Sequence, residues 1–443
     1  MKQIPKKQLI KFGIIALFYI LWVIWLHNYW WLLGLIVIFD MYLTKKVNWT
    51  FWKKRNTKNK SVIEWLDALI FALIAVTFIN IFFFQNFNIP TSSMEKSLLV
   101  GDYLFVSKVN YGPRLPNTPL SFPLVQHTLP LTKDRNSFLT WIKKPYKRLK
   151  GLEKIKNNQP VVFNYPEGDT VCTKFQSNQS YYSLIRQYGR KEVWNNSSSF
   201  GRIVVRPVDK KENFIKRCIG IPGDTVEVRH NWVYVNGHPQ DSIPNLQFMY
   251  QVVTDGTPIN QIKLERMGIY KSDLYFSGGV YIMPLTEKNR RLISNFPNVK
   301  FVERMETPAG STDPNLFPFD IKFGWSRDNY GPIWIPKKGA SVNLTLDNLP
   351  LYQRIIDVYE HNDLEVKDST IYINGKPADK YRFKMDYYWM MGDNRHNSAD
   401  SRYWGFVPED HIVGKPLFVY FSLNKEKKFP AKIRWNRILM KIK

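Results

Sequence analysis

The sequence predicts N-terminal transmembrane helices followed by a mainly β domain outside the cytoplasm. Three observations lead to this fold class. Residues 68–84 are almost continuously apolar, the segment before them is strongly basic, and the chain from about residue 86 consists of short β-rich runs. Gly, Pro, Asn and Asp separate these runs, as is typical of strands joined by turns.

The apolar run at 68–84 is long enough to cross a bilayer. Together with Trp65 and Leu66 it would form a helix of about 30 Å, the thickness of a hydrocarbon core. We therefore expect a transmembrane helix over residues 65–84.

Residues 9–43 contain two further apolar stretches, separated only by His27 and Asn28. A single helix over both would be too long to cross without heavy tilt, so a tight hairpin with spans at 9–26 and 29–43 is favoured. One tilted span and a cleavable signal peptide are the alternatives, although no small-residue cleavage site follows a short apolar core.

The loop at 44–60 sets the expected orientation. It carries seven basic residues and no acid. Basic loops stay in the cytoplasm, so the helix at 65–84 leaves the cytoplasm and the chain from about Gln85 onward lies outside. Residues 1–85 are thus expected to form a membrane anchor.

The net charge of +26 calls for an anionic partner, and the positions of the charges indicate which. Residues 1–64 hold eleven Lys or Arg against two acids, and the tail at 425–443 holds eight against one. Both blocks mix with Trp, Phe, Ile and Leu, which favours the lipid bilayer as partner. No zinc-ligand spacing or RNA-binding aromatic motif appears, so we do not expect a nucleic-acid partner.

The exported part contains a repeated pattern. The run at 227–239 recurs at 365–377, each with a strand, a polar turn, a strand and an Asn-Gly turn. Internal duplication and independent turn chemistry both explain this match. Residues 125–155 are basic and amphipathic, which suits either a membrane surface or a solvated loop.

Two residues far apart in sequence are candidates for nucleophilic chemistry. Ser93 lies in a polar loop just beyond the predicted membrane surface. Strand alternation places Lys216 on the same face as Phe214 and Cys218, with Arg217 directed the other way. Burial lowers the pKa of a lysine, and only a neutral amine can take the proton of an attacking serine. Ser93 and Lys216 are therefore a candidate Ser–Lys dyad.

The segment at 390–415 is polar and Gly-containing with short apolar flanks, which makes it a poor core and a candidate site wall. The two cysteines, Cys172 and Cys218, are too few for a metal site or a disulfide framework. We expect Cys218 to be a small buried thiol.

These stretches, in this order after an N-terminal anchor, resemble the bacterial type I signal peptidases. PTSSM around Ser93 is similar to the family's nucleophile box, and GDYLFVSKVNYG to the strand after it. FIKRCIGIPGD is similar to the lysine box, and GDNRHNSADSRYWG to the distal box. The resemblance covers residues 86–112, 158–166, 213–239 and 363–421.

The resemblance implies a role for each matching residue. Ser93 would be the nucleophile and Lys216 the general base. Thr91 matches the position whose hydroxyl helps the Ser93 amide to form the oxyanion hole. Ser398 matches the hydroxyl that orients the lysine amine.

Asp400 and Arg402 match a supporting ion pair of the family. One position departs from the family pattern, because His396 stands where an acid is usual. The ion pairing around Arg395 is therefore expected to differ, without loss of activity.

The resemblance also implies an antiparallel signal-peptidase-like β fold with an inserted accessory β-rich region. The catalytic core is expected in two parts, residues 86–239 and residues 363–424. An accessory insertion at 240–362 separates them, and a basic tail follows at 425–443.

The implied function is Ser–Lys hydrolysis of exported precursors, removing signal peptides after small residues at Ala-x-Ala-like sites without a metal or cofactor. The implied location is the bacterial inner membrane, multi-pass, with the catalytic domain on the periplasmic side and the secretion machinery as a further partner. The alternatives are another Ser–Lys processing peptidase of the same fold and a catalytically silent membrane scaffold.

The orientation is directly testable. A reporter enzyme that is active only outside the cytoplasm should be inactive when fused after Lys60 and active when fused after Gly112, because the basic loop is retained inside. Activity of the Lys60 fusion would reverse the orientation and with it the substrate pool.

Overall fold

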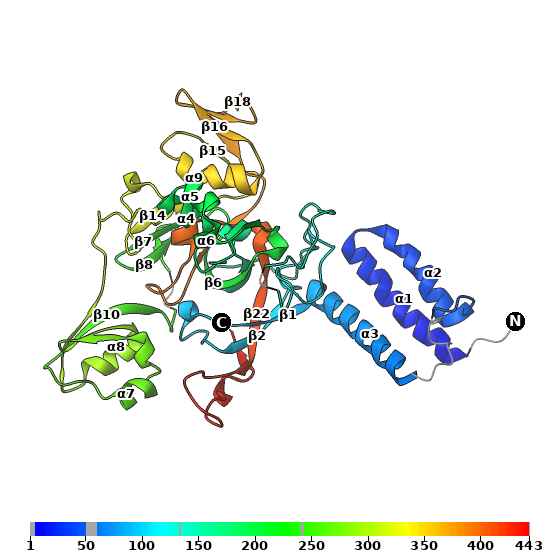
Figure 1. Cartoon of the computed structure of the whole chain (residues 1–443), viewed down its shortest axis with the longest axis horizontal. Coiled ribbons are helices and arrows are strands. Elements are labelled where there is room, and N and C mark those ends of the chain that lie inside the picture. The colour runs from blue at the N-terminus through cyan, green and yellow to red at the C-terminus, as the bar shows by residue number, and fades with distance from the viewer. Residues whose placement is uncertain (1–4, 50–59, 133, 241–242, 443) are drawn as a thin grey trace.

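The computed structural model describes residues 5–49, 60–132, 134–240 and 243–442. The helices α1 (Lys6–Leu26), α2 (Gly34–Phe39) and α3 (Lys60–Phe82) lie together at one side of the molecule, and a β-rich body forms the rest (Figure 1). The expected mainly β domain after the apolar helices is therefore confirmed.

The first two apolar stretches form a helical hairpin. Helix α1 ends where His27 adopts a left-handed conformation, and the chain returns beside α1 (Figure 1). The returning arm joins a 3₁₀ turn, α2 and a π turn over residues 29–44. The Tyr19 hydroxyl donates to the Trp31 carbonyl, and the Phe12 and Phe39 rings pack edge to face. The predicted reversal is thus present.

Two helices are long and apolar enough to cross a bilayer, Lys6–Leu26 and Ser61–Phe82. The returning arm Tyr29–Thr44 is shorter. Most of the predicted cytoplasmic loop at 44–60 falls on residues 50–59, which lie outside the described residues. Membrane crossing and orientation remain predictions.

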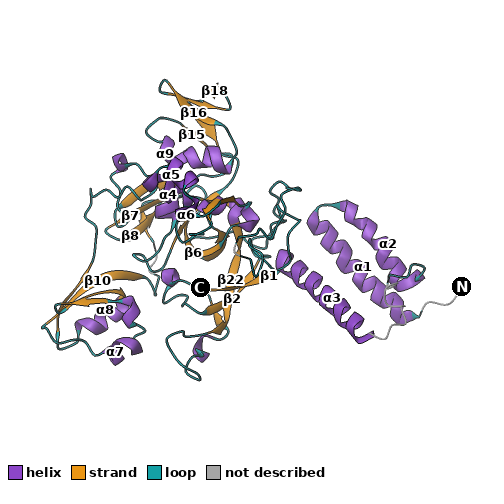
Figure 2. Cartoon of the chain, in the orientation of Figure 1, coloured by secondary structure: helices purple, strands orange, loops and turns teal. Residues whose placement is uncertain are grey.

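The main sheet, whose strands are among those drawn in orange in Figure 2, is a half-barrel, and its neighbouring strands are antiparallel. Its first strand begins two residues after α3 ends, so the sheet edge lies next to the end of that helix. In spatial order the strands are β1 (Phe84–Asn88), β2 (Asp102–Ser107), β22 (Ile412–Ser422), β3 (Pro160–Asn164), β6 (Asn213–Gly220), β20 (Tyr387–Met391) and β21 (Val407–Pro408), with β23 (Met440–Lys441) also paired to β22.

Two apolar clusters hold β6 and β20 in place. On one side, Phe163, Cys218, Met390 and Trp404 belong to a single buried cluster. Cys218 is fully buried, as expected, and forms no disulfide with Cys172.

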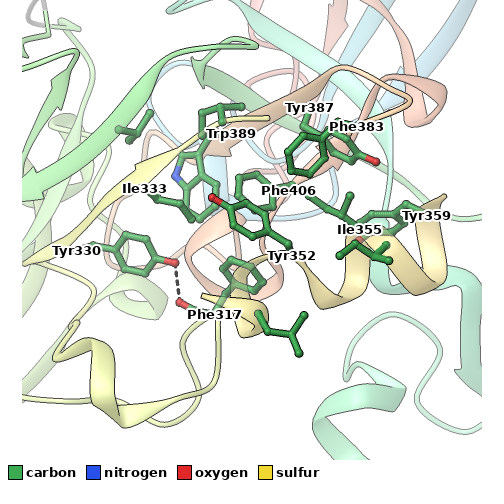
Figure 3. Close-up of a cluster of buried hydrophobic side chains, with 14 of the residues drawn as sticks. Phe317, Tyr330, Ile333, Tyr352, Ile355, Tyr359, Phe383, Tyr387, Trp389 and Phe406 are labelled. Carbon is green, nitrogen blue, oxygen red and sulfur yellow. Dashed lines mark hydrogen bonds between the residues drawn. The ribbon is translucent and has the colours of Figure 1, made fainter. Parts of the chain in front are cut away.

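A larger aromatic cluster packs against β20 (Figure 3). The Trp389 ring is fully buried there, and the Tyr330 hydroxyl donates to the Phe317 carbonyl at 2.6 Å. The backbone of β20 is therefore held firmly up to Met391, the residue before Gly392.

The repeated sequence adopts the same three-stranded meander twice. The first copy is β7 (Thr225–Arg229), β8 (Trp232–Val235) and β9 (His238–Pro239), and the second is β16 (Leu364–Lys367), β17 (Thr370–Ile373) and β18 (Lys376–Pro377). Asn236 and Asn374 take the same positive-φ position, each followed by glycine. The geometry fits both a duplication and independent turn chemistry.

Part of the segment between the two meanders forms a separate sheet with its own apolar core. Its strands, in spatial order, are β11 (Tyr275–Ser277), β12 (Val280–Thr286), β10 (Gln247–Thr254) and β13 (Val299–Arg304), covered by α7 (Gln261–Arg266) and α8 (Glu287–Ser294). We call this body the accessory sheet. It projects from one side of the β-rich body (Figure 1).

The remaining elements are short. They are α4 (Tyr181–Tyr188), α5 (Arg190–Asn195), α6 (Ser197–Phe200), α9 (Leu349–Arg354) and α10 (Ser401–Trp404), and the strands β4 (Thr170–Cys172), β5 (Ile203–Val205), β14 (Tyr330–Trp334), β15 (Ser341–Asn343) and β19 (Lys380–Arg382).

The basic segment at 125–155 folds as turns and isolated bridges in its described part. It contacts the end of α1, because Trp25 Nε1 donates to the Lys150 carbonyl at 3.1 Å. Trp141 is 82% exposed. This placement beside an apolar helix fits the membrane-surface alternative, which stays a prediction.

Candidate active site

Ser93 lies in the 3₁₀ turn Ser92–Met94, shortly after β1. One side of the turn is anchored because Met94 is buried in an apolar cluster with Leu104 and Val162 of the main sheet. The turn is also anchored by Asn394, whose backbone N–H donates to the Ser93 carbonyl at 3.1 Å and whose side chain donates to the Ser92 carbonyl. The segment that carries Ser93 (residues 89–95, the serine loop) and the segment after β20 (residues 392–400, the distal loop) are therefore joined.

Lys216 of strand β6 contacts Ser93 through its side chain. Its side chain is 4% exposed, and its Nζ lies 2.6 Å from Ser93 Oγ and 3.1 Å from the Ile215 carbonyl oxygen. The Phe214 ring lies on the same side, with its centroid 5.6 Å from Nζ. The structure thus brings the two sequence-predicted residues into direct contact.

Arg217 turns away from this contact, as strand alternation predicts. Its guanidinium pairs with the buried Asp393 carboxylate through two hydrogen bonds of 2.8 and 2.6 Å. This pair holds the start of the distal loop against β6.

Burial lowers the pKa of Lys216 to about 8. The carboxylates of Asp400 and Asp393 act in the opposite direction without cancelling the effect. Within the described residues, Lys216 forms no ion pair at 4 Å or less. A large fraction of Lys216 is therefore neutral in mildly alkaline solution.

Asp400 and Arg402 form the expected ion pair. Two hydrogen bonds of 2.9 and 2.8 Å join them, and Asp400 also accepts the Gly392 N–H at 3.1 Å. Burial alone would raise the pKa of Asp400, but the Arg402 guanidinium lowers it overall. Asp400 is therefore ionised, and the Arg402 guanidinium balances its charge.

Ser398 and Gly392 lie in close contact at the site wall. A Cβ added to Gly392 would lie 2.2 Å from Ser398 Oγ and 2.5 Å from the Ser93 carbonyl oxygen, so only glycine fits. Ser398 Oγ is buried and has no hydrogen-bond partner in the described part of the chain. Its predicted bond to Lys216 is not formed in this structure and stays a prediction.

The candidate nucleophile and base line one cavity of about 550 Å³. The hydroxyl-bearing side chains Thr91, Ser93 and Ser398 share it with Lys216. Its other described lining residues include the apolar side chains Ile89, Leu104, Val162 and Ile215. Asp400 and Arg402 lie outside the lining. Among the described residues, no group of three His, Cys, Asp or Glu side chains is arranged to hold a metal ion.

His396 has a structural environment that the sequence did not predict. Its Nδ1 accepts the Met249 N–H at 3.1 Å, so its Nε2 donates to Asp328 and Asn231, each at 2.8 Å. Burial lowers the pKa of His396, while the Asp328 carboxylate opposes this shift. His396 thus joins the distal loop to the accessory sheet, and both its ring nitrogens are engaged away from Ser93.

Three supporting residues escaped sequence reasoning. Asn394 fixes the serine loop, Asn397 donates to Ser92 Oγ at 3.1 Å, and Gln247 of the accessory sheet exchanges backbone hydrogen bonds with the distal loop. The Asn-rich distal box was a usable signal for the first two. Gln247 carried no signal, because its contacts are made through the backbone.

Comparison with known proteins shows the family. The chain matches the family described as Signal peptidase, peptidase S26, over residues 62–267 and 378–421. It is 22% identical over 387 residues to Signal peptidase I of Buchnera aphidicola subsp. Baizongia pistaciae, covering 86% of this chain and 84% of the relative. It is 24% identical over 390 residues to Signal peptidase I of Helicobacter pylori strain J99, covering 86% of this chain and 91% of the relative.

The half-barrel fold and these matches define the class of the chain as a serine peptidase. Within that class it belongs to the signal peptidase family, peptidase S26, whose members remove signal peptides.

The close packing at Gly392 predicts a sensitive position. Gly392→Ala should push the Ser93 carbonyl or Ser398 aside and lower peptidase activity by at least roughly 100-fold, as small misplacements of a reacting group do. Gly13→Ala, where the added Cβ meets nothing within 4 Å, is the matched control. Unchanged kcat/KM in Gly392→Ala would show that this approach does not position the serine.

Proposed function

We propose that the chain is a membrane-bound endopeptidase that removes signal peptides from exported precursors, with Ser93 as nucleophile and Lys216 as general base. One observation carries the proposal. Lys216 Nζ contacts Ser93 Oγ at 2.6 Å in a cavity where the lysine is almost fully buried. A serine and a desolvated amine at hydrogen-bond distance are the two groups that acyl transfer needs.

The reaction then proceeds by an acyl-enzyme. Neutral Lys216 takes the Ser93 proton as Oγ attacks the scissile carbonyl carbon. The amine of the departing chain receives that proton when the peptide bond breaks, which leaves the signal peptide esterified to Ser93. Lys216 next deprotonates a water molecule, which hydrolyses the ester and frees Ser93.

The developing oxyanion needs donors in front of Ser93. The Ser93 N–H and the Thr91 hydroxyl fill this role in the proposal, because Thr91 lines the same cavity two residues earlier. Loss of one such donor costs about 3 to 4 kcal/mol of transition-state stabilisation. Ser398 orients Lys216 after a side-chain rotation that places its free hydroxyl against Nζ.

Preference for small residues follows from the apolar side chains that line the cavity. Ile89, Leu104, Val162 and Ile215 are compatible with short side chains next to the cleaved bond. An extended precursor can add as a strand along the cavity, which reads little sequence beyond those side chains.

The location in the proposal is the bacterial inner membrane with the β-rich body on its outer side. Two helices of sufficient length and apolarity, the end of α3 next to β1 and the basic segment near α1 support it. The lipid bilayer and precursor proteins are then the partners, and the secretion machinery would meet the chain at the same surface.

The two proposed catalytic groups should act as one unit. Ser93→Ala and Lys216→Ala should each abolish cleavage of a precursor with an Ala-x-Ala site, and the double variant should be no slower than either. The products are measured by sequencing the new N-terminus. Ser92→Ala is the matched control and should retain cleavage, because the Ser92 hydroxyl bonds to Asn397 whereas Lys216 contacts the hydroxyl of Ser93. Activity retained in Ser93→Ala would show that Ser93 is not the nucleophile.

The rate should rise with pH. Since burial lowers the pKa of Lys216 to about 8 and the base works only when neutral, kcat/KM should climb through that pH to an alkaline plateau. The measurement is a pH–rate profile of the detergent-solubilised chain. A profile that follows a group near pH 6.5, the ordinary histidine range, and disappears in His396→Ala would replace the lysine by a histidine.

A further inference from the structure

A second cavity, of about 630 Å³, shares part of its lining with the active-site cavity and extends towards the end of α3. The two cavities share Phe87 and Asn88 of β1 and Asn213 of β6. Thr77, Asn80 and Ile81 in the last turns of α3 also line the second cavity. It therefore lies between the proposed cleavage site and the helix that is expected to enter the membrane.

One face of strands β2 and β3 changes from apolar to polar along this path. Leu104 and Val162 line the active-site cavity, and strand alternation brings Lys108 and Asn164 to the same face farther along. The ladder continues to Lys108, whose N–H donates to the Phe83 carbonyl at 2.8 Å. The second cavity thus has a polar floor built by the same strands.

The charge of this floor is positive. We call the second cavity the basic chamber, after its lining residues Lys108, Arg114 and Lys210. Asp209 is the one carboxylate among its described lining residues, and it already accepts the N–H and hydroxyl of Thr118 at 2.9 and 2.6 Å.

The two chamber lysines, the half-buried Lys108 and the buried Lys210, have no partner among the described residues. Lys210 is 8% exposed, and neither its Nζ nor that of Lys108 has a hydrogen-bond or ion-pair partner within the part of the chain that the structure describes. Burial and the nearby Arg114 and Arg148 lower the pKa of Lys108 to about 7. Cations removed from water are normally paired, so an anion entering the chamber would favour the charged form of both lysines.

One wall of the chamber is tied down. The Gln126 side chain donates to the Asp209 and Lys211 carbonyls at 3.2 and 2.7 Å, and Thr118 holds Asp209. Residues 119 and 121–126 thereby line the chamber together with Asn213 at the start of β6. The chamber is a built cavity rather than an open patch of surface lysines.

Resting on the proposed function, we propose that the basic chamber binds an acidic side chain of the precursor on the N-terminal side of the cleaved bond. That part of the precursor leads back to its own apolar segment in the membrane, as the chamber leads to α3. Asn213 is three residues from Lys216 along β6, a rise of about 10 Å, so an extended precursor reaches the chamber about four to seven residues before the cleaved bond.

The test varies charge on both partners. Synthetic precursors identical except for Glu, Gln or Lys at the fifth residue before the cleaved bond are incubated with the full chain in detergent at low salt. We expect kcat/KM to be at least roughly 10-fold higher for Glu than for Lys, with Gln between them. The ratio should shrink in Lys108→Gln and Lys210→Gln, invert in Lys210→Glu, and persist in Lys300→Gln on the exposed strand β13.

The outcomes separate this inference from the proposed function. Equal cleavage of the Glu and Lys precursors by the wild-type chain, scanned over the fourth to seventh residues, overturns the chamber's role and leaves Ser93 and Lys216 untouched. Failure of Ser93→Ala to abolish cleavage overturns the proposed function instead. If the lysine variants lose activity equally on all precursors, and only in vesicles that contain anionic phospholipid, the chamber binds a lipid headgroup and the peptide inference is wrong.

Discussion

The buried contact between Lys216 and Ser93 is the interaction on which the rest of the site depends. A lysine that is almost fully buried and without an ion pair among the described residues is costly for folding. This unfavourable burial is offset by the packing of β6, whose residues Phe214 and Cys218 lie in one apolar cluster and whose Ile215 lies in another. The nearby carboxylates are held elsewhere, Asp393 by Arg217 and Asp400 by Arg402. Lys216 can therefore lose its proton in mildly alkaline solution.

The serine is held by segments that are distant in sequence. The distal loop supplies Asn394 to the serine turn, and the accessory sheet supplies Gln247 to the distal loop. His396 adds a second link, through Met249 and the buried Asp328. The accessory sheet thus acts as a brace for the active site. His396 is part of that brace, and its Nε2 donates to the Asp328 carboxylate from another segment.

Local patterns predicted much of this arrangement. Alternation along residues 213–220 gave the directions of Lys216 and Arg217, and the break at His27 indicated the helical hairpin. Motif resemblance brought Ser398, Asp400 and Arg402 into the candidate site. Long-range backbone pairing was not predictable from one sequence, because Gln247 bonds to the distal loop through its backbone N–H and carbonyl, which every residue type except proline carries. The basic chamber likewise arises only when Lys108 and Lys210, far apart in the chain, come to line one cavity.

The protonation state of Lys216 tests the central claim most directly. Trace acetylation of the full chain in detergent with limiting acetic anhydride, quantified by mass spectrometry across a pH series, reports the neutral fraction of each lysine. The account predicts that labelling of Lys216 rises with a midpoint at a pKa of about 8, while exposed Lys300 serves as an internal reference. A midpoint for Lys216 near 10.4, the ordinary value for lysine, would contradict it.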